Sequence, residues 1–394
     1  MKNKVLLYLL LSTATVIIGC KAPLKKVVKP PYDKQLLPGQ SALRKITNPA
    51  EIPDFSSACF DMEGLKTSVD RSLNYLHKPS SKKFFPVSGI NHEMAVDSLK
   101  EFSTLLGSGV KGADLNATIR DKFDVYMSVG CDDNGTVLFT GYYTPIFEGS
   151  FEPSDRFKYP LYKQPDNLIK DPNGGVLGRK MADGSITPYP PRAVIEDAMM
   201  LNGKELIWLS DPFEAYIAHI QGSAKIRLPD GKLVTVGYVA HNGHEYKSMS
   251  QAMVKDGKIS SSQLSLAAII KYFKEHPDEV QYYTRLNPRF IFFGKQEGDP
   301  RGSLNEPVTP MRTIATDKSI FPRGCLTFIS TTLPKEDAGD VVMQPFTGFM
   351  LDQDTGGAIR APGRCDVYIG MGDMAGKLAG QTYQEGKLYY LFSK

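Results

Sequence analysis

Three aspartates near the C-terminus stand in apolar or glycine-rich surroundings, where a solvated surface acid is not expected. They are Asp317, Asp354 and Asp366, and the second of them is followed closely by Gly356 and Gly357. Glycine lets a backbone approach a ligand closely. Carboxyl groups packed near one another raise each other's pKa, which is what a general acid requires. The pattern predicts acid–base chemistry on a bulky substrate.

The N-terminus indicates where that chemistry takes place. Lys2 and Lys4 precede an apolar run, Val5–Ile18, which at about 14 residues is shorter than the ~20 that a spanning helix needs. The run reads as a signal peptide of residues 1–19. It ends in Ile17-Ile18-Gly19-Cys20, which resembles the bacterial lipobox, so Cys20 is expected to be lipidated. The alternative is an ordinary secretory signal with a chance cysteine.

Residues 20–50 are rich in lysine and proline and show no apolar period, which indicates an extended tether behind the lipid. The whole chain has a formal net charge of +4, and removal of the signal takes away two lysines. A chain so nearly balanced gives no support to nucleic-acid binding, which favours a clustered basic face.

The spacing of apolar residues predicts helices early in the chain. One is expected from His92 to Leu106, and a second is expected to begin at an Asp114 cap and to include Tyr126. From Val137 the pattern changes to short strands, expected at 137–143, 159–162, 224–228 and 232–238. Helices are expected again at 249–254, at 262–276 and after Pro277, with only strands and loops from Phe290 onward.

The length beyond the tether exceeds that of a usual single domain, so two domains are expected. An inserted β-rich domain of residues 140–285 would interrupt a first domain of residues 51–139 and 286–394. The predicted fold class is mainly β with α-helices, some of them near the N-terminus.

Four strings resemble motifs of the membrane-bound lytic murein transglycosylase A family, and they occur in the family's order. They are Phe139–Pro145, His219–Ala224, Gly237–Ser248 and the C-terminal segment, which resembles the family's three-aspartate domain. The residues before 139 match only in general character. The resemblance implies a double-psi β-barrel for the first domain and a glycan groove between it and the insert.

The resemblance also implies a reaction. The family cleaves the β-1,4 bond between N-acetylmuramic acid and N-acetylglucosamine, and the muramoyl 6-hydroxyl attacks its own anomeric carbon to leave a 1,6-anhydro end. One carboxyl can serve as acid and then as base, because the nucleophile belongs to the substrate. By resemblance that group is Asp366, with Asp354 and Asp317 as orienting neighbours. For each acid the alternative is a carboxylate that caps a loop.

The family motifs also indicate the residues that bind the glycan. The expected substrate-binding residues are Gly141, Tyr142, Tyr143, Gln221, Gly222, Ser223, Asn242, Gly243, His244, Tyr246, Gly356 and Gly357. Gln221, Asn242 and His244 are expected to face the groove rather than the core. The enzyme class implied is a peptidoglycan lytic exotransglycosylase, a lyase acting on polysaccharide, although action at strand ends or within strands depends on whether the groove is open.

Other chemistries have weaker support. Asp354-Thr355-Gly356 is also the aspartic-protease triplet, but that chemistry needs two triplets and no second one occurs. His219, His241 and His244 could indicate zinc, yet no ligand pattern supports it. No phosphate-binding glycine loop precedes a helix. An expansin-like protein that binds glycan without cutting it, and a hydrolase of the same fold, stay as alternatives. No cofactor or metal is expected.

Four cysteines remain after lipidation: Cys59, Cys131, Cys325 and Cys365. An exported protein can pair them in three ways, and Cys325 and Cys365 could brace the acid loops. Four buried free thiols are the alternative. The chain is thus expected to be a monomeric outer-membrane lipoprotein that faces the periplasm, binds peptidoglycan strands and could join cell-wall enzyme complexes.

Overall fold

The computed structural model describes residues 30–172, 174–261 and 263–394, and residues 31–394 form one compact unit. The predicted signal peptide, Cys20 and the first part of the tether lie outside the described residues. Among the residues that are described, no helix has the length and apolar character needed to cross a bilayer.

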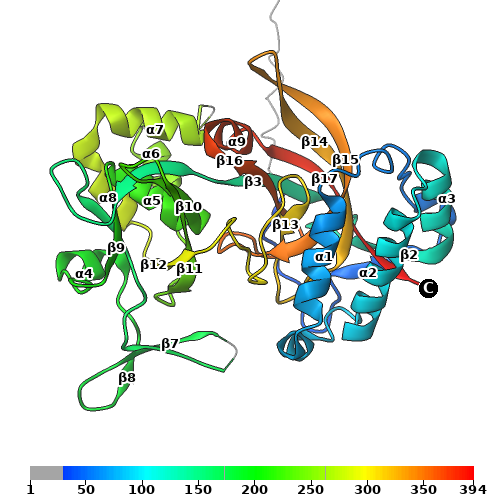
Figure 1. Ribbon diagram of the computed structural model, residues 1–394, viewed down its shortest axis with the longest axis horizontal. Coiled ribbons are helices and arrows are strands. Elements are labelled where there is room, and N and C mark those ends of the chain that lie inside the picture. Colours follow the sequence, from blue (N-terminus) through cyan, green and yellow to red (C-terminus); the bar gives the residue numbers. More distant parts are fainter. Residues whose placement is uncertain (1–29, 173, 262) are drawn as a thin grey trace, which may run out of the picture. The chain divides into compact units, whose positions relative to one another are not determined.

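Six strands close into a barrel (Figure 1). Their order is β17-β14-β15-β13-β16-β3, and β17 pairs with β3 to complete the ring. The pairs β13–β15 and β16–β3 are parallel, and the other pairs are antiparallel. The predicted barrel is confirmed, and its strands are β3 (Val137–Thr144), β13 (Thr313–Ala315), β14 (Leu326–Asp337), β15 (Asp340–Asp354), β16 (Arg364–Met371) and β17 (Tyr383–Ser393).

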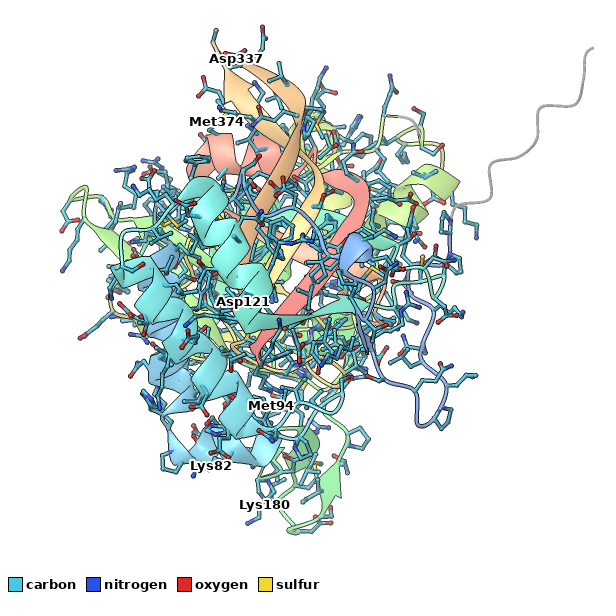
Figure 2. The ribbon with its side chains drawn as sticks, turned by 90° about the vertical axis from the view of Figure 1, so that its right-hand side faces the viewer. Lys82, Met94, Asp121, Lys180, Asp337 and Met374 are labelled. Atoms are coloured by element: carbon cyan, nitrogen blue, oxygen red, sulfur yellow. The ribbon has the colours of Figure 1, made fainter. Side chains whose placement is uncertain are left out.

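The N-terminal region adds helices to the barrel. Strands β1 (Leu43–Lys45) and β2 (Phe123–Ser128) extend the sheet beyond β17, and the helices are α1 (Leu65–Leu76), α2 (His92–Gly107) and α3 (Gly112–Lys122). Figure 2 shows the helices that carry Met94 and Asp121 packed beside the strands. It also shows Asp337 at the tip of the β14–β15 hairpin.

The second predicted helix is wrong in both its cap and its end. Lys111 occupies the N-cap, so Asp114 lies in the first turn, and α3 stops at Lys122. Tyr126 belongs to β2, which pairs with Lys45 on one side and with Tyr390 on the other. Pairing along two strand edges supplies backbone hydrogen bonds that outweigh the apolar helical spacing.

The inserted part has its own six-stranded sheet, in the order β12-β11-β10-β4-β9-β5, and a three-stranded sheet β6-β7-β8. Its strands are β4 (Ile146–Ser150), β5 (Tyr159–Tyr162), β6 (Leu168–Lys170), β7 (Val176–Lys180), β8 (Ile186–Thr187), β9 (Glu205–Leu209), β10 (Ser223–Arg227), β11 (Leu233–His241) and β12 (Ile291–Gln296). Its helices are α4 (Arg192–Asp197), α5 (Pro212–Gln221), α6 (Met249–Lys255), α7 (Leu266–Glu275) and α8 (Val280–Arg285).

Strand pairing differs from the predicted domain limits of 140 and 285. Residues 140–144 pair within the barrel, whereas β12 pairs with β11 of the insert. The chain therefore leaves the barrel near Pro145 and returns after Gln296. A helix was also missed beyond Phe290, namely α9 (Gly372–Ala379). Its eight residues include Gly372 and Gly376, which hide its apolar period.

Each part has a separate apolar core. In the barrel, Phe55 lies edge-on to Phe328 with ring centroids 4.8 Å apart, and Phe102 packs on Phe349. In the insert, Phe213 and Phe273 have ring centroids 4.6 Å apart. A third cluster, which includes Tyr189, Phe290 and Phe292, also belongs to the inserted part.

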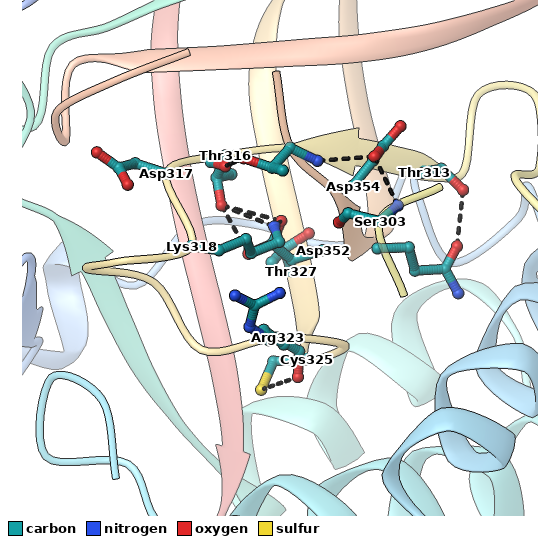
Figure 3. A network of polar contacts seen from close by, with 12 residues as sticks. Ser303, Thr313, Thr316, Asp317, Lys318, Arg323, Cys325, Thr327, Asp352 and Asp354 are labelled. Atoms are coloured by element: carbon teal, nitrogen blue, oxygen red, sulfur yellow. Dashed lines mark hydrogen bonds and ion pairs between the residues drawn. The ribbon is translucent and has the colours of Figure 1, made fainter. Parts of the chain in front are cut away.

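A buried ion pair lies inside the barrel (Figure 3). Lys318 bonds to Asp352, and both side chains are almost completely excluded from solvent. Asp352 also accepts hydrogen bonds from the Thr316 hydroxyl at 2.8 Å and from the Tyr390 hydroxyl at 2.7 Å. The pair ties the chain that leaves β13 to strand β15.

We expect Lys318→Met to lower the free energy of unfolding by about 3–5 kcal/mol, because it leaves a buried charge without its partner. Urea unfolding measures the change. The control is Lys66→Met, which breaks the exposed pair with Asp70 and should cost at most about 1 kcal/mol. A loss at Lys318 as small as that of the control would contradict the structural role of the pair.

Candidate active site

Strand β13 brings two of the three predicted acids together. Ala315 pairs with Asp354 on β15 and, on its other side, with Asp366 on β16. The two aspartates are therefore separated by two strand spacings, about 10 Å between Cα atoms. On the far side of β16, Asp366 pairs with Thr140 of β3.

A bulge gives Asp354 different surroundings from Asp352. Ile314 pairs with Asp352 and Ala315 with Asp354, so Gln353 is the extra residue. Two residues that are two apart would share similar surroundings on a regular strand, and a bulge breaks that alternation. Asp352 is enclosed in the barrel, whereas Asp354 is only half-buried. Because of the bulge, Asp352 is an acid of the buried framework, whereas Asp354 is a candidate functional acid.

Both carboxylate oxygens of Asp354 have partners. Oδ1 accepts from the backbone N–H groups of Ser303 and Thr355, each at 2.8 Å, and Oδ2 accepts from the Tyr142 hydroxyl at 2.9 Å. Figure 3 shows the contact with Ser303. Burial raises the pKa of Asp354, and these hydrogen bonds oppose the rise. Three hydrogen bonds therefore fix the position of the Asp354 side chain.

Asp366 is bonded much less completely. It lies on the face of β16 opposite the core residues Cys365 and Val367, and its Oδ1 is buried with no hydrogen-bond partner among the described residues. Burial raises the pKa of Asp366 to about 6, and Asp354 adds to the rise. A hydrogen bond with Thr140 and the charge of Arg364 act against it. A carboxyl in this state can hold a proton near neutral pH and release it.

Asp317 is not brought into this pair. Its Oδ1 accepts from the Ser319 backbone at 3.0 Å and hydroxyl at 2.6 Å, and its Oδ2 accepts from the Ala361 N–H at 3.0 Å. Figure 3 shows Asp317 at the opposite end of the network from Asp354. These contacts are those of a loop-capping carboxylate, and they join the loop after β13 to the loop between the other two acids.

Comparison with known proteins identifies relatives of this chain. Residues 138–294 match the MltA specific insert domain, and residues 312–392 match the 3D domain. Membrane-bound lytic murein transglycosylase A of Escherichia coli K12 is 29% identical over 283 residues, which cover 71% of this chain and 72% of that protein. The chain is a homologue of membrane-bound lytic murein transglycosylase A.

Solved structures agree with this assignment. A membrane-bound lytic murein transglycosylase from Agrobacterium tumefaciens matches with a TM-score of 0.75 and 26% identity, over 89% of this chain and 98% of that one. Escherichia coli MltA with bound chitohexaose matches with a TM-score of 0.65 and 25% identity, over 83% and 90% of the two chains. The resemblance drawn from the four motifs is confirmed.

In this lytic transglycosylase homologue the first motif lies on β3. Tyr142 contacts Asp354 and packs on Tyr368 with ring centroids 5.1 Å apart. Tyr143 is buried, and its backbone N–H donates to the Gln221 Oε1 at 3.2 Å. A Cβ at Gly141 would lie 2.9 Å from Ala379 Cα, so this glycine lets α9 approach the strand. Only Tyr142 of the three contacts a candidate acid.

The second motif joins the insert to the barrel. Gln221 ends α5 and bonds to β3, Gly222 is the C-cap of that helix, and Ser223 begins β10. His219, from the same motif, is buried, and its Nδ1 accepts from the Ile291 N–H at 3.0 Å. Burial holds the pKa of His219 well below its usual value.

The prediction that Asn242 faces a groove is wrong. Asn242 is 1% exposed and donates to the carbonyls of Pro190 and Pro288, both at 2.8 Å, while it accepts from the Phe290 N–H. His244 is half-buried, and its Nε2 contacts the Tyr189 carbonyl at 2.8 Å. Short polar side chains in a loop often hold backbone groups in this way, and a single sequence does not separate that role from sugar binding.

The third motif also meets the acid loop. A Cβ at Gly357 would lie 3.4 Å from Arg289 Nε and 3.7 Å from Tyr246 Cβ. Gly356 packs on Ile359, and Gly243 is exposed beside Val176. A Cβ at Gly357 would make only ordinary van der Waals contacts at these distances, so they show that the insert lies close to the acid loop here, and not that the position requires glycine.

Sequence reasoning missed several residues of the site. Asp352, Lys318, Ser303 and Arg289 all contact the acids, their loops or the strands that carry them. For Asp352, the signal that the sequence offered was its position two residues before Asp354. All four described cysteines are free and buried, so the pairing of Cys325 with Cys365 is not formed.

We expect Asp366→Asn to stabilise the protein at about pH 8 and to have little effect at about pH 4. The folded pKa of about 6 lies above that of an unfolded aspartate, so the folded state binds more protons and wild-type stability falls as pH rises from about 4 through 6. The difference could reach about 1–3 kcal/mol, allowing for partial solvent access. Thermal unfolding across pH measures it, and equal stability at pH 8 would contradict the burial of this carboxyl.

Proposed function

We propose that the protein is a lytic transglycosylase that cleaves the β-1,4 bond between N-acetylmuramic acid and N-acetylglucosamine in peptidoglycan. Its relatives bear that enzyme's name, and one of them was solved with a bound chitohexaose. The observation that carries the proposal is the contrast between two neighbouring acids: Asp354 is fully bonded, whereas Asp366 has an oxygen without a partner and a raised pKa.

In this proposal Asp366 is the only proton carrier. It donates its proton to the glycosidic oxygen as the bond to the anomeric carbon breaks. The muramoyl 6-hydroxyl attacks that carbon and gives its proton to the Asp366 carboxylate, which restores the acid. The product ends in a 1,6-anhydro ring, and no water is consumed. A pKa of about 6 suits a group that must both give and take a proton.

Asp354 has a positioning role in this scheme. Its oxygens already accept from Ser303, Thr355 and Tyr142, so it does not supply the second free carboxylate that a hydrolase would use as base or nucleophile. It fixes the Tyr142 ring on the face of the sheet that carries Asp366. Asp317 holds the loop between the two acids through Ala361.

The glycan is proposed to lie on this face, between the barrel and the insert. Tyr142 is half-buried and offers aromatic surface beside Asp366, with the buried ring of Tyr368 packed against it. Tyr246 and Arg289 of the insert approach the loop at Gly357. Aromatic rings present large apolar faces with a polar end, which suits a sugar with hydroxyl and acetamido groups.

We expect Asp366→Asn to lower the rate of murein cleavage by a factor of 10²–10⁴, toward the upper end because one group serves both proton transfers. Asp354→Asn should cost less and should lower the pKa seen in the pH–rate profile only slightly, because burial is the largest cause of the shift. Mass spectrometry of the products decides the reaction, since a hydrolysed end carries one more water than an anhydro end. Hydrolysed ends, or normal anhydro products from Asp366→Asn, would overturn the proposal.

We also propose that the mature protein is an outer-membrane lipoprotein that faces the periplasm, anchored through Cys20. The support is the lipobox-like string before Cys20 and the membrane-bound relatives.

For this anchor, Cys20→Ala should move the protein almost completely to the soluble fraction or leave it unprocessed. Acyl chains contribute ~0.8 kcal/mol per buried methylene, and this thiol is their attachment point. The outcome is measured as the fraction of the protein that pellets with membranes after a high-salt wash. Murein cleavage by the variant is the control, because its acid site is unchanged. Normal processing with continued pelleting would mean that the anchor lies elsewhere.

A further inference from the structure

Arg289 is a charged side chain held firmly in place beside the acid loop. Its Nη1 donates to the His244 carbonyl at 3.0 Å, and its backbone N–H donates to Asn287 Oδ1 at 3.2 Å. Asn242 bonds to the residues on either side of it, Pro288 and Phe290. The insert thus fixes both the backbone and the guanidinium of one arginine.

This arginine has no acid to neutralise it. Within the described residues no carboxylate lies within 4.0 Å of its guanidinium, and the influence of the exposed Glu245 is felt only at longer range. Arg289 is half-buried, and a Cβ at Gly357 would lie 3.4 Å from its Nε, so the guanidinium is near the acid loop. A buried or half-buried charge is normally paired, so an unpaired one at this position is a reason to look for an anionic ligand.

A second arginine extends from the acid loop itself. Arg360 is three residues beyond Gly357, its side chain is 52% exposed, and its only acid contact is a loose one of 3.8 Å to Asp317. Lys170 is a third cation, bonded to the Val239 carbonyl of β11 at 3.0 Å. Burial lowers the pKa of His241 to about 4, and the charges of Arg289, Lys170 and Arg360 add to the fall.

We propose that Arg289 and Arg360 bind a carboxylate of the peptide stem carried by the muramoyl residue of the strand being cut. The proposal rests on the proposed function, because it names the form of the substrate. In an intact strand the lactyl group of each muramoyl residue is joined to its peptide as an uncharged amide, so the carboxylates of the strand belong to the peptide stems. The planar guanidinium matches a carboxylate with two hydrogen bonds. The protein would then bind peptide-bearing strands more tightly than an uncharged oligomer of N-acetylglucosamine.

The test measures binding of the full-length protein to two probes. They are glycan strands with their peptides and an uncharged chito-oligosaccharide, because strands stripped by an amidase would carry a lactyl carboxylate on each muramoyl residue. Asp366→Asn is the background, so that the strands are not cut. Arg289→Gln with Arg360→Gln should raise the Kd for peptide-bearing strands about tenfold, since charge-assisted hydrogen bonds are strong, and should change the Kd for the chito-oligosaccharide much less. Arg289→Lys should retain part of the preference.

Two controls keep the result interpretable. Arg44→Gln removes an exposed arginine of β1 that bonds to the Asp133 carbonyl, and it should alter neither Kd. Arg360→Gln alone removes an exposed side chain, so its melting temperature should match that of the parent, and it should show part of the loss even if Arg289→Gln disturbs the loop.

An equal loss on both probes, or no loss on either, would overturn the carboxylate site. Failure of the proposed function would look different. A protein with Asp366 intact that releases no anhydro ends from peptide-bearing strands is not a lytic transglycosylase, and the binding measurement still decides whether the arginines recognise the peptide carboxylates.

Discussion

The acid site depends on the position of β13 between the two strands that carry Asp354 and Asp366. Because both acids pair with Ala315, the backbone ladder of the barrel sets their separation, and no flexible loop is needed to bring them together. The buried pair of Lys318 and Asp352 then secures the chain where it leaves β13. The barrel therefore acts as a rigid frame for a small number of polar groups.

Burial, more than the neighbouring carboxylate, raises the pKa of Asp366. It is the largest cause of the raised pKa, and the charge of Asp354 is the smallest of those that act. The sequence argument expected close carboxylates to raise each other's pKa, but here the two acids belong to strands that are not adjacent. The same burial makes the ionised form unfavourable, so a group suited to proton transfer is also a local loss of stability at higher pH.

The barrel could be predicted because four motifs in order carry the resemblance to a family, and several strands could be predicted because short apolar runs between turns leave a local signal. What could not be predicted depends on contacts between distant residues. The apolar spacing around Tyr126 predicts a helix, but in the structure this residue pairs with β1 and with β17. Asn242 reads as a sugar-binding residue until Pro190, Pro288 and Phe290 are seen around it. The bulge at Gln353, which separates Asp352 from Asp354, leaves no mark in the local sequence.

The loop Asn242–His244 links the insert to the acid site through Arg289. Asn242 holds the residues on both sides of that arginine, the His244 carbonyl accepts from its guanidinium, and the guanidinium lies near Gly357. Gly357 in turn follows Asp354 by three residues. A side chain that never contacts substrate can thus decide where a charge lies at the acid loop. The loop of the insert and the three-aspartate segment are therefore neighbours, although the barrel and the insert have separate apolar clusters.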